Sequence, residues 1–75
     1  MVDRVLDVKG VNCPLPILKA RKALNELPAG GLLRVVATDP GSVIDFQAFC
    51  QTTGNELIES LAEDGVFSFL IRNRG

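Results

Sequence analysis

Two prolines, separated by one residue, follow the first cysteine in the segment Cys13-Pro14-Leu15-Pro16, and they restrict where a helix can begin. A proline disfavours helical backbone in the residue before it, so Cys13 is expected just outside a helix, at its N-cap. Prolines are tolerated in the first helical turn, where the missing N–H has no intrahelical partner. The segment therefore predicts a stiff helix start with Pro14 at N1 and Pro16 at N3.

The rest of the chain alternates between strand-like and helix-like hydrophobic patterns. Strands are expected over residues 5–8, 32–38, 56–63 and 66–72, and helices over residues 14–27 and 40–53. The dipeptide Asp64-Gly65 is a typical hairpin turn between the last two strands. For the second helix, Asp39 suits the N-cap, Pro40 suits N1 and Gly54 suits the residue after the end.

This order predicts an α+β fold, a two-layer α/β sandwich with the element order βαβαββ. Both helices follow strands and must return the chain across one sheet, and right-handed crossovers place them on one face. The expected sheet is four-stranded and mixed, with an apolar patch on its other face formed by Leu32, Val36, Val66 and Leu70. Residues 1–75 are expected to form a single domain, because so short a chain has no room for a second core.

Composition argues against several classes of function. The net charge is −1, with eight basic and nine acidic residues, so direct nucleic-acid binding is not expected. No run of about 18 apolar residues predicts a membrane span, and the N-terminus does not resemble a signal peptide, which favours a cytoplasmic protein. The chain has no histidine and no Cys-x-x-Cys pair. We therefore expect no metal, and no Cys–His or Ser–His catalytic pair.

The position of Cys13 favours covalent chemistry at its sulfur. The helix macrodipole places partial positive charge at a helix N-terminus, and cysteines there can have a lowered pKa. We expect the Leu15 N–H to be the principal hydrogen-bond donor to the sulfur, because Pro16 has no N–H. Nearby basic residues add positive potential. A thiolate without an acid, a base or a resolving partner suits the acceptance and donation of a covalent group.

Other interpretations of the two cysteines remain open at this point. A free cysteine is often only a small buried hydrophobe, and we favour that interpretation for Cys50, which lies on an apolar helix stripe. For Cys13 it is less favoured, because serine or aspartate caps a helix better. One alternative is a regulatory or protein-interaction module without sulfur chemistry. Another is a thiol–disulfide redox protein, which would require Cys50 to lie near Cys13.

The chain resembles the TusA/SirA-like sulfur carrier proteins. The resemblance rests on the motif Leu6-Asp7-x-x-Gly10-x-x-Cys13-Pro14-x-Pro16, followed by Lys19-Ala20-Arg21-Lys22-Ala23-Leu24, Asp39-Pro40 and Phe49-Cys50. It implies a fold similar to the C-terminal domain of translation initiation factor three. It also implies that Cys13 receives persulfide sulfur from a cysteine desulfurase or a rhodanese-like donor.

In this family the sulfur passes to an acceptor protein, for transfer-RNA thiolation, sulfur oxidation or cofactor synthesis. The resemblance implies a sulfurtransferase-like carrier with no independent turnover and no cofactor. Gly10 is expected to let the loop approach closely, and Pro14, Leu15 and Pro16 to shape the turn that supports the thiolate. The basic residues of the first helix are candidate docking contacts for partners: Lys19, Arg21 and Lys22.

Overall fold

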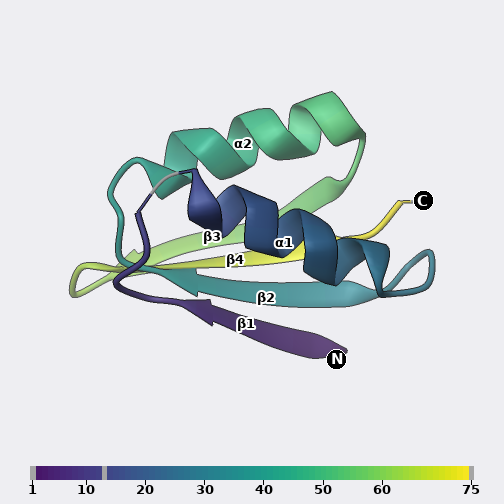
Figure 1. Cartoon of the computed structure of the whole chain (residues 1–75), viewed down its shortest axis with the longest axis horizontal. Coiled ribbons are helices and arrows are strands. Elements are labelled where there is room, and N and C mark those ends of the chain that lie inside the picture. The colour runs from purple at the N-terminus through teal and green to yellow at the C-terminus, as the bar shows by residue number, and fades with distance from the viewer. Residues whose placement is uncertain (1, 13, 75) are drawn as a thin grey trace.

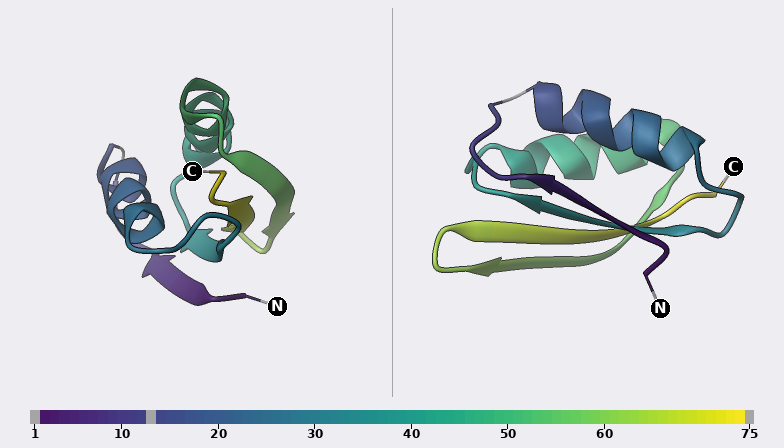
Figure 2. Two further views of the ribbon diagram at one scale, coloured as in Figure 1. Left: turned by 90° about the vertical axis from the view of Figure 1, so that its right-hand side faces the viewer. Right: turned by 60° about the horizontal axis from the view of Figure 1, so that its bottom comes forward.

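The structure, a computed structural model, describes residues 2–12 and 14–74 and confirms the predicted fold class (Figure 1). Two helices pack on one face of a four-stranded mixed sheet, as Figure 2 shows from two further sides. The elements are β1 (Arg4–Val8), α1 (Leu15–Asn25), β2 (Leu32–Ala37), α2 (Ser42–Thr53), β3 (Glu56–Glu63) and β4 (Val66–Arg72). None of the helices in the described part of the chain has the length and apolar character needed to cross a bilayer.

The sheet has the strand order β1-β2-β4-β3, with β1 and β2 parallel and the other two pairs antiparallel. Ala37 pairs with Val8 on one side of β2 and with Phe67 on the other. The loop after β1, the loop after β2 and the β3–β4 hairpin therefore lie at the same end of the sheet (Figure 1). This end of the sheet carries the segment that leads to position 13.

The core lies between the sheet and the two helices. Alternate residues of β2 are fully buried, as the period of a strand requires. Phe46 of α2 occupies the centre of this layer, with its ring stacked on that of Phe69 at a centroid distance of 4.8 Å. The buried hydrophobic residues are Val8, Ala20, Ala23, Leu24, Leu33, Val35, Ala37, Phe46, Phe49, Cys50, Phe69 and Ile71.

Helix α1 begins one residue later than predicted and ends two residues earlier. Its N-cap is Pro14, with φ −96° and ψ 12°, so Leu15 is N1 and Pro16 is N2. The prediction of Pro14 at N1 was wrong because a turn precedes the helix, in which the Leu15 N–H donates to the Asn12 carbonyl at 3.0 Å. At the other end of α1, the Asn73 side chain donates to the carbonyls of Leu24 and Leu27.

Helix α2 also begins later than predicted, at Ser42 with Gly41 as its N-cap. Asp39 is not the N-cap, because Asp39-Pro40 forms a separate turn before the helix. Its carboxylate accepts the Gly41 N–H at 3.1 Å, and its carbonyl accepts the Ser42 N–H at 2.9 Å. Gly54 ends α2 in the left-handed conformation, at φ 79°, as predicted.

No helix in the part of the chain that the structure describes covers the second face of the sheet (Figure 2). The four residues predicted to form an apolar patch there are all partly exposed. Arg34 lies among them and donates to Ser68 of the neighbouring strand β4 at 2.8 Å and to Glu59 of β3, the strand beyond it, at 3.0 Å. The patch is therefore divided by an ion pair rather than continuously apolar.

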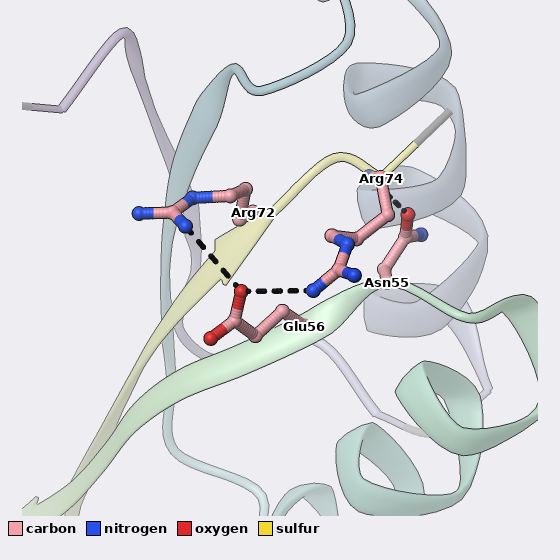
Figure 3. A network of polar contacts seen from close by, with 4 residues as sticks. All are labelled: Asn55, Glu56, Arg72 and Arg74. Carbon is pink, nitrogen blue, oxygen red and sulfur yellow. Dashed lines mark hydrogen bonds and ion pairs between the residues drawn. The ribbon is translucent and has the colours of Figure 1, made fainter.

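A polar network fastens the C-terminal segment at the other end of the sheet (Figure 3). The Glu56 carboxylate pairs with Arg72 at 3.5 Å and with Arg74 at 3.3 Å, and the Asn55 side chain accepts the Arg74 N–H. The three charged side chains are exposed, so each pair contributes less than about 1 kcal/mol. The network's main effect is to hold the chain after β4 beside the start of β3.

Candidate functional site

The candidate site begins with the loop between β1 and α1. Its first turn is closed by the Val11 N–H, which donates to the Val8 carbonyl at 3.1 Å. At the centre of this turn, the Gly10 N–H donates to the Thr38 hydroxyl at 2.9 Å. Thr38 directly follows β2, so this bond joins the loop to a central strand of the sheet.

Gly10 has a different role from the one predicted. A Cβ placed on Gly10 would meet no atom of the described residues within 4 Å, so close approach does not explain the glycine. Its φ is 78°, in the left-handed region that other residues adopt only at a cost of about 1–2 kcal/mol. Gly10 therefore permits the sharp turn that follows β1.

Cys13, the predicted reactive residue, lies outside the described residues, and its role stays a prediction. Its two neighbours in the chain, Asn12 and Pro14, are both exposed. Two large apolar side chains in the first turns of α1 are exposed as well, Leu15 by 50% and Leu18 by 54%. The described residues near position 13 in the sequence are therefore exposed and partly apolar, which suits contact with a protein partner.

The predicted donation of the Leu15 N–H to sulfur involves Cys13, which lies outside the described residues, so it stays a prediction. Among the described residues, this N–H donates to the Asn12 carbonyl. Pro16 has no N–H, and the Ile17 N–H donates to the Pro14 carbonyl at 3.1 Å. The first-turn amides of α1 that carry hydrogen are therefore engaged with backbone carbonyls. The N-terminus of α1 also carries the partial positive charge of the helix dipole, which favours a nearby thiolate.

A groove between α1 and α2 starts beside Pro14. It has a volume of about 290 Å³ and is open to solvent along its length. The sequence did not indicate this groove, because it forms only where α1 packs against α2. Pro14, Ile17, Arg21, Asp45, Ala48, Phe49 and Thr52 line it.

The three predicted docking residues do not form one patch. All three are exposed, but Arg21 faces α2, where its guanidinium carbon lies 5.8 Å from the centroid of the Phe49 ring. Lys22 lies near Glu26. The pKa of Glu26 is lowered chiefly by a hydrogen bond and an ion pair from Arg4, and further by the charge of Lys22. Lys19 is three residues before Lys22 and so shares its side of the helix. Arg21 is therefore the only one of the three that borders the groove.

Cys50 lies in the core of the described structure, as predicted. Cys50 is only 5% exposed, and this burial raises the pKa of its thiol to about 11. A thiol of this kind is a poor nucleophile at neutral pH, since the thiolate is the reactive form. The described residues therefore supply no second reactive thiol, and they contain no cluster of residues that would bind a metal.

The buried thiol of Cys50 gives a testable pH dependence of stability. Its folded pKa of about 11 is above the ordinary value of 9.0, so the unfolded chain loses the proton first as the pH rises. This contribution to the free energy of unfolding is complete below pH 9 and is lost as the pH rises toward about 11. We expect Cys50→Ala to lose less stability than the parent over this range, as measured by urea unfolding. Equal losses in the two proteins would contradict the assignment.

Comparison with known proteins identifies the family. The family model described as Sulfurtransferase TusA matches residues 4–73. The chain is 60% identical over 70 residues to the sulfur carrier protein TusA of Allochromatium vinosum, covering 93% of this chain and 92% of that protein. It is 46% identical over 74 residues to a putative sulfur carrier protein of Neisseria meningitidis serogroup A, covering 99% and 100%.

A solved structure shows the same architecture. The crystal structure of a SirA-like protein from Desulfitobacterium hafniense superimposes with a TM-score of 0.83 at 34% sequence identity, over 92% of this chain and 95% of that one. Sequence and fold thus agree over nearly the whole chain. The chain belongs to the TusA family of sulfur carrier proteins.

Proposed function

We propose that this protein relays sulfur as a persulfide on Cys13. The observation that supports the proposal is the exposure of the described residues on either side of position 13. Asn12 and Pro14 are both exposed, and the turn before them is bonded to Thr38 at one end of the sheet. Exposed apolar side chains follow in the first turns of α1 and an open groove begins beside Pro14, which suits the docking of a partner protein there.

The transfer requires two substitutions at sulfur, and neither requires an external oxidant. The Cys13 thiolate attacks the outer sulfur of a donor persulfide, a new S–S bond forms, and the donor cysteine leaves as a thiolate. The proton on the outer sulfur stays with it. In the second step an acceptor thiolate attacks the same outer sulfur, and Cys13 leaves as a thiolate. The carrier returns to its starting state.

The donor that fits this chemistry is a cysteine desulfurase or a rhodanese-like protein, and the acceptor is a protein with a reactive thiol. In the family that the chain resembles, such carriers serve transfer-RNA thiolation, sulfur oxidation or cofactor synthesis. Residues 1–75 would act as one carrier domain in the cytoplasm, without a cofactor and without turnover of their own. Pro14 and Pro16 would stiffen the chain on the helical side of Cys13.

The proposal is tested by intact-mass measurement after incubation with a cysteine desulfurase and cysteine. We expect the chain to gain the mass of one sulfur atom, and a reductant to remove it. Cys50→Ala should gain the same mass, because the Cys50 thiol is buried. No mass gain with an active donor, or a gain that is lost in Cys50→Ala, would contradict the proposal.

Arg21 is the docking residue that the geometry favours. Its guanidinium borders the groove beside Pro14, whereas Lys22 lies near the Glu26 carboxylate on another side of α1. We expect Arg21→Glu to raise the donor concentration needed for half-maximal sulfur loading about tenfold, as loss of an interfacial charge contact often does. Lys22→Glu is the matched control, with an expected change of less than about twofold. Equal effects of the two charge reversals would contradict a specific role for Arg21.

A further inference from the structure

We infer that Thr38 is a positioning residue for the sulfur relay, acting through the Gly10 N–H rather than on sulfur itself. The inference rests on the proposed function of Cys13. It starts from the hydrogen bond in which Gly10 donates to the Thr38 hydroxyl at 2.9 Å, across 28 positions of sequence. None of the sequence patterns considered above indicates this contact.

The register of the sheet explains why these two residues meet. Val8 is the last residue of β1 and pairs with Ala37, the last residue of β2. Beyond this pair the two segments separate. The segment after β1 turns into the loop toward α1, and the segment after β2 turns toward α2 (Figure 1). The Thr38 hydroxyl therefore holds the loop where backbone pairing has ended.

The bond acts on the residue that sets the direction of the loop. Gly10 has φ 78° and reverses the chain five residues before the first residue of α1. A glycine in an exposed loop has many accessible conformations, so a bond to its N–H selects one of them. Position 13 lies between this fixed turn and the Pro14 N-cap of α1, which is fixed by the helix. The bond to Thr38 and the start of α1 thus hold the described residues on the two sides of position 13.

The hydroxyl is the part of Thr38 that this role requires. Thr38→Val keeps the shape of the side chain but removes the acceptor, while the exposed Gly10 N–H can still bond to water. We expect folding to persist and the loop to sample other conformations. Losing a hydrogen bond of ordinary strength lowers the equilibrium constant between the bonded and the open loop about fivefold.

The experiment compares the unsubstituted protein with Thr38→Val and Thr38→Ser. Sulfur loading from a cysteine desulfurase is followed by intact mass, and hydrogen exchange at the Gly10 amide is followed by NMR. We expect Thr38→Val to exchange about fivefold faster at Gly10 and to load sulfur more slowly, by at most about fivefold. Thr38→Ser should restore both, because it keeps the hydroxyl. If Thr38→Val does not fold, Thr38→Ala takes its place.

The two readouts separate this inference from the function on which it rests. A merely structural Thr38 would change the melting temperature without a loading defect that serine rescues. Unchanged loading in Thr38→Val, or an equal loss in Thr38→Val and Thr38→Ser, would overturn the positioning role. If the unsubstituted protein takes up no sulfur, the proposed function fails. Hydrogen exchange at the Gly10 amide then still tests whether the bond to Thr38 forms.

Discussion

Replacing Cys13 by serine is expected to abolish both sulfur acceptance and sulfur delivery, which is the largest functional effect predicted for a single substitution. A serine hydroxyl is not ionised at neutral pH and does not take the place of a thiolate in attack on a persulfide. Loading is measured by intact mass, and delivery by the appearance of sulfur on an acceptor protein. We expect no detectable signal in either assay, and a melting temperature close to that of the parent.

Cys50→Ala is the matched control, because it removes the other cysteine and leaves Cys13 in place. It should load and deliver sulfur like the parent, with some loss of stability from the cavity left in the core. If Cys13→Ser kept the protein's function in cells, the alternative of an interaction module without sulfur chemistry would be favoured instead. If loading persisted on Cys50, the assignment of the carrier cysteine would be wrong.

Phe46→Ala is expected to produce the largest loss of stability. Phe46 is fully buried, stacks on Phe69 at 4.8 Å and meets Phe49 edge-on at 6.2 Å between ring centroids. Removing a buried phenylalanine side chain typically costs about 3–5 kcal/mol, including the cavity that remains. A domain this small has little stability to lose, so we expect a large fraction of the variant to be unfolded at 37 °C. Urea unfolding followed by circular dichroism measures the effect.

Ile44→Ala is the control on the same helix. Ile44 is 72% exposed, so its replacement should change the free energy of unfolding by less than about 0.5 kcal/mol. A small effect of Phe46→Ala, or effects of similar size at the two positions, would show that the packing described around Phe46 does not hold the helix layer on the sheet.

Much of the fold followed from local patterns in the sequence. The sequence predicted a strand over residues 32–38 and a hairpin turn at Asp64-Gly65. The structure has β2 at Leu32–Ala37, and Asp64 and Gly65 both have positive φ between β3 and β4. The helix starts were predicted too early. A turn precedes each helix, closed by a bond to the carbonyl of Asn12 or Asp39, and the Asp39 side chain accepts a further bond. Such turns depend on hydrogen bonds that a hydrophobic pattern does not report.

The candidate site was predictable only where it is local in sequence. The Cys-Pro-x-Pro motif marked position 13, and the apolar stripe of α2 marked Cys50 as a core residue. The bond between Gly10 and Thr38 joins positions far apart in the chain, and no spacing rule indicates it. The groove beside Pro14 likewise arises from the packing of α1 on α2, which brings Arg21 next to Phe49.

The most direct test of a relay is to follow one sulfur atom through the protein. The chain is loaded with radiolabelled sulfur from a cysteine desulfurase, purified away from the donor, and mixed with an acceptor protein that has a reactive thiol. The account predicts that the label leaves Cys13 and appears on the acceptor in stoichiometric amount. Label that never resides on Cys13, or that stays there until a reductant frees it as sulfide, would contradict the account.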